Sequence, residues 1–164
     1  MQSYLIHLEL LYYFGLVWLF TLGGIIENNM TRINLVEPSE LTDQHLIAEY
    51  REIFMVGGSL KRTLVSKTGY REDRVPKKYT LNTGHVYFFY NKGRYLHKRY
   101  TELILEMKRR GFEPDPSRVF PTKVFKDNGL YNDWLPSVED YKIIRQRIEE
   151  KIAMKPNWYR KTEC

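Results

Sequence analysis

The sequence contains a single cysteine, Cys164. One thiol cannot form a disulfide within the chain, and this cysteine cannot assemble a zinc site with the residues around it. Four histidines, at positions 7, 45, 85 and 97, show no metal-ligand spacing with the cysteine or with a carboxylate cluster. A glycine-rich phosphate-binding loop is also missing. These absences exclude a disulfide scaffold, suit a reducing compartment, and leave no metal or nucleotide motif to explain a function.

Residues 1–29 contain no lysine or arginine and only two acids, Glu9 and Glu27. Residues 30–164 therefore carry all 26 basic residues against 18 acidic ones, a net charge of +8. The basic residues are interleaved with many of the chain's 13 tyrosines and 3 tryptophans. This pattern favours a polyanionic partner, and nucleic acid more than a membrane, although a merely soluble basic protein would carry the same charge.

The stretch from Leu10 to Ile26 is uncharged and, at 17 residues, has the minimum length of a membrane span. It can be a membrane anchor, a signal segment without the usual basic residues, or sequence translated from a start codon placed too early. We favour the third interpretation, because an extension would put an amide where the chemistry described below needs an amine. The expected organisation is an apolar extension, 1–29, followed by one domain of ordinary size, 30–164.

A chain that starts at Met30 would have the small residue Thr31 next, the arrangement from which the initiator methionine is usually removed. The new α-amine would have a reference pKa of about 7.7 to 8.0, so a useful fraction is unprotonated at neutral pH. Such amines attack carbon electrophiles and form Schiff bases. Thr31 is therefore a candidate nucleophile, and Glu52 a candidate carboxylate for the same chemistry. The alternative is an ordinary loop threonine and a solvated glutamate.

Helical spacing of apolar residues predicts an all-α fold, a compact single domain of three main helices with long loops. The first helix follows Pro38, with Ser39 or Thr42 as its N-cap. Gly57 and Gly58 weaken its middle and mark a kink or a close approach. Two sets of residues lie on separate faces of this helix: an apolar stripe of Leu46, Tyr50, Ile53, Phe54, Leu60 and Leu64, and a polar face of His45, Glu49 and Glu52.

Two further helices follow from the same spacing. One spans about 92–110 and ends at Gly111. The other opens at Ser137 with Asp140 at the third helical position, a variant of the capping box, and ends at Pro156. Its basic residues repeat every four positions, at Arg147, Lys151 and Lys155. Between the helices, residues 82–90 are either a buried strand or aromatic packing around a turn, and residues 113–136 are an irregular connection.

Five blocks of the sequence resemble a known family in both content and order. They read TRINL, LTDQHLIAEYRE, GHVYFFYNK, KRYTELI with KRRGF, and EKIAMKPNWYRK, and they run from Thr31 to Lys161. The family is the pyrimidine-dimer DNA glycosylases of the phage endonuclease V type, which are UV-repair enzymes. A basic helical DNA-binding module without chemistry, with or without a membrane tether, is the alternative function.

The resemblance implies a glycosylase with abasic-site lyase activity on UV-damaged double-stranded DNA. In this family the α-amine at the position of Thr31 attacks the sugar carbon C1′ and leaves an imine, and β-elimination then cuts the strand. The glutamate at the position of Glu52 stabilises that intermediate. No metal, cofactor or obligate protein partner is implied, and the enzyme would be a monomer. It would work inside the cell wherever the genomic DNA lies, in cytoplasm, nucleus or a virus-infected cell, with a membrane involved only if residues 1–29 are retained.

The resemblance also implies a set of DNA-binding residues, each of which would otherwise be interpreted as a surface charge or a structural aromatic. The set is Arg32, Gln44, His45, Arg51, Arg147, Lys151, Trp158 and Tyr159. The sequence departs from the family at Met55, where an arginine is expected one helical turn after the catalytic glutamate. The connection at 113–136 also diverges, so no contacts are inferred there.

Overall fold

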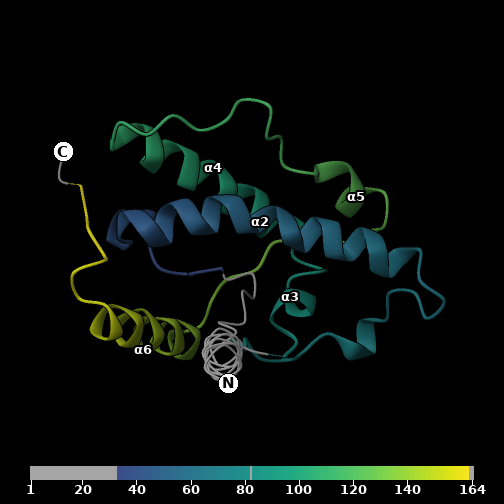
Figure 1. Cartoon of the computed structure of the whole chain (residues 1–164). Helices are drawn as coiled ribbons and strands as arrows, with labels where there is room; N and C mark the ends of the chain where they lie inside the picture. Colours follow the sequence, from purple (N-terminus) through teal and green to yellow (C-terminus); the bar gives the residue numbers. More distant parts are fainter. Residues whose placement is uncertain (1–32, 82, 163–164) are drawn as a thin grey trace, which may run out of the picture.

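The computed structural model describes residues 33–81 and 83–162, and these residues are helical without a strand (Figure 1). The expected extension 1–29, Thr31 and Arg32 lie outside the described residues. The helices are η1 Pro38–Glu40, α2 Asp43–Leu64, η2 Glu72–Arg74, α3 His85–Phe88, α4 Gly93–Arg109, α5 Thr122–Lys126 and α6 Val138–Met154. The predicted all-α fold with three main helices, α2, α4 and α6, is confirmed. Within this described part, none of the helices is long and apolar enough to cross a membrane.

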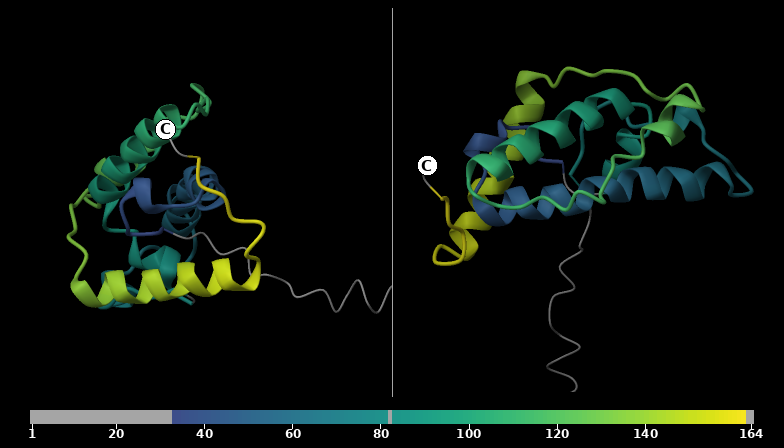
Figure 2. Two further views of the ribbon diagram at one scale, coloured as in Figure 1. Left: turned by 90° about the vertical axis from the view of Figure 1, so that its left-hand side faces the viewer. Right: turned by 90° about the horizontal axis from the view of Figure 1, so that it is seen from above.

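Helix α2 runs through the middle of the molecule, with α4 on one side of it and α3 and α6 on the other (Figures 1 and 2). It begins at Asp43 because the Thr42 side chain accepts a hydrogen bond from the backbone N–H of His45. The predicted apolar stripe faces the core: Leu46, Tyr50, Ile53 and Leu60 are buried, and Phe54 and Leu64 are partly buried against them. The stripe thus packs α2 against the core, and Glu49 of the polar face also reaches Arg99 of α4.

Helices α4 and α6 begin and end within a residue or two of the predicted positions. Gly111, with φ of +78°, provides the left-handed residue that ends α4. Ser137 and Asp140 form the capping box that starts α6. Helix α4 buries Leu96, Tyr100, Leu103 and Met107, whereas Ile144 is the only buried residue of α6. Helix α6 therefore lies at the rim of the core rather than within it.

The two ambiguous stretches also become clear. Residues 85–88 form the short helix α3, so the aromatic run packs around a helical turn, and a buried strand there is wrong. The connection at 113–136 is irregular except for α5, which inserts Phe125 into the core.

The two central glycines of α2 differ in what surrounds them, and they give a matched pair of variants. A Cβ on Gly57 would lie 2.6 Å from Cγ of Pro121, whereas the nearest atom to one on Gly58 is the tip of Arg62 at 3.8 Å. We expect Gly58→Ala to raise the free energy of unfolding by up to about 1 kcal/mol, because alanine is the better helix former. Gly57→Ala should lower it by about 1–3 kcal/mol through overpacking. Urea unfolding followed by circular dichroism measures both, and two changes of the same sign would contradict the expectation.

Candidate functional site

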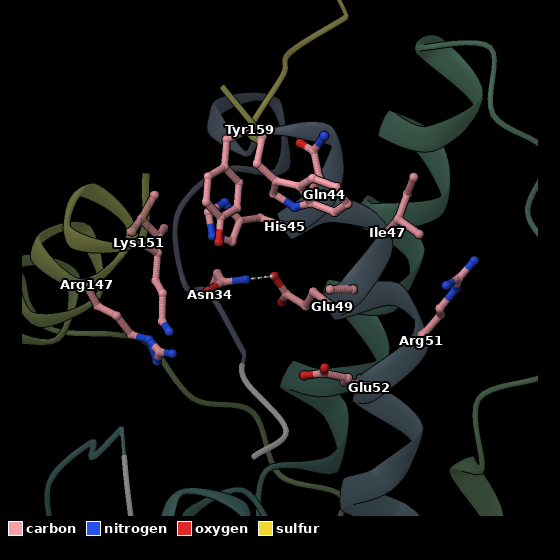
Figure 3. Close-up of a pocket in the computed structure, with 13 residues that line it drawn as sticks. Asn34, Gln44, His45, Ile47, Glu49, Arg51, Glu52, Arg147, Lys151 and Tyr159 are labelled. Carbon is pink, nitrogen blue, oxygen red and sulfur yellow. Dashed lines mark hydrogen bonds between the residues drawn. The ribbon is translucent and has the colours of Figure 1, made fainter. Parts of the chain in front are cut away.

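A pocket of about 500 Å³ opens between α2 and α6. Figure 3 shows Arg147 and Lys151 extending from α6 toward the polar face of α2. The pocket is lined from four separate parts of the chain: the segment before η1, helix α2, helix α6 and the tail that follows α6. The lining residues are Asn34, Gln44, His45, Ile47, Ala48, Glu49, Arg51, Glu52, Arg147, Ile148, Lys151, Trp158 and Tyr159. Every predicted site residue within the described part thus lies at this one pocket.

The predicted polar face of α2 forms one wall of the pocket. His45, Glu49 and Glu52 follow one another at spacings of four and three residues, which places them along one side of the helix. Their environments differ, because Glu49 is 1% exposed while Glu52 is half-buried. The shared face is therefore confirmed, but it is not evenly solvated.

Glu49 can be buried because it forms an ion pair with Arg99 of α4. Nε of Arg99 lies 2.7 Å from one carboxylate oxygen of Glu49, and a terminal nitrogen lies 2.9 Å from the other. Burial alone lowers the pKa of Arg99, but the charge of Glu49 more than offsets this and the pKa is raised above its usual range. The side-chain amide of Asn34 also donates to Glu49, at 3.0 Å (Figure 3). Both oxygens of Glu49 thus accept hydrogen bonds, and its side chain is part of the buried support of the pocket wall.

Two cations form the opposite wall. Arg147 and Lys151 are one turn apart on α6, and both line the pocket. Lys155, the third residue of the predicted basic row, is the exposed C-cap of α6 and is not among the lining residues. Arg51 is exposed and extends from the far side of α2 in Figure 3, so it lies at the outer edge of the pocket. The cations near the pocket thus stand on two sides of its mouth.

The tail after α6 forms the third wall. The ring of Tyr159 stacks on the ring of His45, with centroids 4.5 Å apart and planes 11° from parallel. The side-chain oxygen of Gln44 accepts the backbone N–H of Arg160 at 2.9 Å. Trp158, with 63% of its surface exposed, stands at the rim. Two adjacent residues of α2, Gln44 and His45, therefore fix where this aromatic wall lies.

Asp43 anchors the end of this tail. Its carboxylate accepts the backbone N–H and the hydroxyl of Thr162, and it also pairs with Arg110 at 2.8 Å. Burial raises the pKa of Asp43, but the hydrogen bonds from Arg110 and Thr162 outweigh it and hold the pKa below its ordinary value. Arg110 is held in turn by Glu106, whose pKa is lowered to about 2 mainly by its hydrogen bond from Arg109. The first turn of α2 is thus tied both to α4 and to the tail.

Sequence reasoning missed the residues that support the pocket from behind. Asn34 and Arg99 had no local signal, since their partners lie 15 and 50 residues away along the chain. His85 accepts the backbone N–H of Ile33 and is fully buried, which its position within an aromatic run could have indicated. Met55, where the resemblance leads one to expect arginine, is about half exposed and does not line the pocket. Across residues 33–81 and 83–162, no group of three His, Cys, Asp or Glu could hold a metal ion.

Comparison with known proteins identifies the family. Residues 30–119, more than half of the chain, match the family model described as pyrimidine dimer DNA glycosylase. The match covers η1, α2, η2, α3 and α4, and it includes the pocket wall that carries Gln44, His45, Glu49, Arg51 and Glu52. Helix α6 and the aromatic tail lie beyond it. The chain belongs to the pyrimidine dimer DNA glycosylases, enzymes that bind DNA and repair UV damage.

Proposed function

We propose that this enzyme excises cyclobutane pyrimidine dimers from duplex DNA and then cuts the strand itself, with the α-amine of Thr31 as its nucleophile. The observation that carries the proposal is the pocket in which Glu52 faces Arg147 and Lys151, next to Asn34 (Figure 3). Thr31 is three residues before Asn34, and three extended residues span at most about 11 Å. An amine at Thr31 is therefore within reach of the pocket.

The reaction can be written with this amine as the nucleophile that attacks the sugar. The neutral amine attacks C1′ of the damaged nucleotide, and the base leaves with the electrons of the glycosidic bond and takes up a proton. The sugar ring opens as its oxygen is protonated, which leaves an imine between Thr31 and C1′. Loss of a proton from C2′ then expels the 3′ phosphate, and water hydrolyses the imine to return the amine. The chain's own groups suffice for each step, so no metal or cofactor is needed.

Glu52 takes the acid–base part of this scheme. Its half-buried carboxylate on the pocket wall stabilises the positive charge that develops on the iminium. It also accepts the proton that leaves C2′. Glu49 is assigned neither task, because it is almost fully buried in its ion pair with Arg99.

The remaining lining residues hold the DNA. Arg147 and Lys151 bind phosphates from one side of the pocket, and Arg51 binds them from its outer edge. Gln44 and His45 make supporting contacts. Arg32, which lies outside the described residues, is a further phosphate-binding residue of the proposal. Trp158 and Tyr159 offer aromatic faces for an extruded base. A dimer already weakens pairing and stacking, so extrusion at the lesion costs less than in intact duplex. The enzyme works as a monomer in the compartment that holds the DNA.

Borohydride trapping tests the nucleophile. Two proteins are compared, the whole chain and a chain started at Met30, which retains the entire core of Ile33 to Ile148. Intact mass establishes which of them begins at Thr31. With UV-irradiated duplex and borohydride, we expect the protein that begins at Thr31 to form a covalent adduct at its N-terminal peptide, and the whole chain to form none. An adduct at a lysine, or equal trapping by a chain whose residues before Thr31 are intact, would overturn the proposal.

A further inference from the structure

The segment Ile33–Val36 is buried although it belongs to no helix. These four residues expose between 0 and 5% of their surface. Backbone groups buried without helical partners must be satisfied by other groups, because an unpaired N–H or C=O in the interior is costly. The partners that satisfy them therefore determine where this part of the chain lies, two residues after the proposed nucleophile.

Side chains from α3, from α4 and from the loop before α3 supply these partners. The backbone N–H of Ile33 donates to Nε2 of His85, at 3.1 Å, and its carbonyl accepts the hydroxyl of Tyr79, at 2.9 Å. Further along, the guanidinium of Arg99 donates to the carbonyls of Asn34 and Val36. Ile33 is thus held on both its N–H and its C=O, at the point of the described chain nearest to Thr31.

The geometry fixes the tautomer of His85. The Ile33 N–H can only donate, so Nε2 of His85 must present its lone pair. The ring proton is then on Nδ1, from which it is donated to the backbone carbonyl of Thr80. The ring packs edge-on against Tyr79 and Phe89, with centroids 5.5 and 5.3 Å away. The hydrogen bond from Nδ1 to Thr80 therefore orients the ring so that Nε2 accepts the backbone N–H of Ile33.

We propose that His85 is a positioning residue for the reaction: it fixes the backbone at Ile33 and thereby the reach of the Thr31 amine into the pocket. The inference rests on the proposed function, since it needs the amine to be the nucleophile. A displacement of about 1 Å between reacting groups can cost about 100-fold in rate, and two residues of chain transmit a shift at Ile33 to the amine. Tyr79 assists by holding the carbonyl of the same residue.

Two substitutions at His85 separate positioning from packing. The side-chain oxygen of His85→Gln can occupy the place of Nε2 and accept the Ile33 N–H, whereas His85→Asn retains a group only at the place of Nδ1. The chain that begins at Thr31 is mixed with a duplex containing one abasic site, and the single-turnover rate of borohydride trapping and the Kd for that duplex are measured. We expect His85→Asn to slow trapping by about 10- to 100-fold with little change in Kd, and His85→Gln to restore most of the rate.

His97 provides the matched control. It is also on a helix and stacks on Phe120, but its hydrogen bond goes to Tyr131 and not to the segment Ile33–Val36. His97→Asn should trap at the parent rate. Two outcomes would overturn the positioning role alone. In the first, the parent forms an adduct and His85→Asn forms it at the same rate. In the second, His85→Asn and His85→Gln are equally slow. A parent that forms no adduct would overturn the proposed function and this inference with it.

Tyr79→Phe keeps the proposal testable if His85→Asn does not fold, which thermal unfolding would reveal. This variant retains the ring and removes only the hydroxyl that donates to Ile33. We expect a several-fold slower trapping rate at unchanged Kd. The proposal fails if His85→Asn is unfolded and both Tyr79→Phe and His85→Gln trap as fast as the parent. The His85 ring would then have only a structural role.

Discussion

Glu52→Gln is expected to bind UV-irradiated duplex DNA as tightly as the parent enzyme and to leave it uncut. Glutamine has nearly the same shape as glutamate, so the half-buried position on α2 is preserved. It cannot accept the C2′ proton, and it brings no negative charge to the iminium. Loss of a positioned acid–base group costs about 100- to 10,000-fold in rate. Binding should not weaken, because the substitution removes a negative charge from a surface that faces phosphates.

Single-turnover cleavage at saturating enzyme, together with a Kd titration, measures both effects. Glu102→Gln is the matched control, because Glu102 is a carboxylate of α4 that does not line the pocket. It should cut at the parent rate. Strand scission by Glu52→Gln within a few-fold of the parent would remove Glu52 from the mechanism and would leave Glu49 as the carboxylate to examine.

Arg99→Met should produce the largest loss of stability. Arg99 and Glu49 are both almost fully buried and pair through two hydrogen bonds. Removal of one partner leaves a buried charge without compensation, which costs about 3–5 kcal/mol. The backbone of Asn34 and Val36 loses its donors at the same time. The free energy of unfolding from urea denaturation should fall accordingly.

Lys98→Met is the control for this variant, on the same helix and one residue away. Lys98 pairs with Asp133 at the surface, and exposed pairs contribute about 0–1 kcal/mol. A second comparison adds Glu49→Leu to Arg99→Met, which removes the remaining charge and should recover part of the lost stability. Arg99→Met within about 1 kcal/mol of the parent would show that the buried pair contributes little.

The helices of this enzyme could be predicted because their signals are local. The second main helix was expected at about 92–110 and lies at Gly93–Arg109, since apolar residues recur every three or four positions and Gly111 ends the run. Ser137 and Asp140 identified the start of α6 in the same way. Signals of this kind depend on neighbours within one or two turns, which a single sequence displays directly.

The supports of the pocket could not be predicted, because they join distant parts of the chain. The sequence showed Glu49 on a polar face of its helix but not the arginine 50 residues away that buries it. The residues that hold Ile33 lie 46 and 52 positions further along. The sequence around α3 fits two interpretations, since four residues carry too little periodicity to separate a helical turn from a strand.

Asp43 shares its carboxylate between Arg110 and Thr162, and this has a consequence for how substitutions combine. The Arg110 side chain is completely buried, so replacement of Asp43 removes a counter-charge from this buried guanidinium as well as the hydrogen bonds that hold Thr162. Groups that share one partner have free energies that do not add. Changes at these three positions are therefore interdependent: once Asp43 has been replaced, a further substitution of Thr162 has little left to remove.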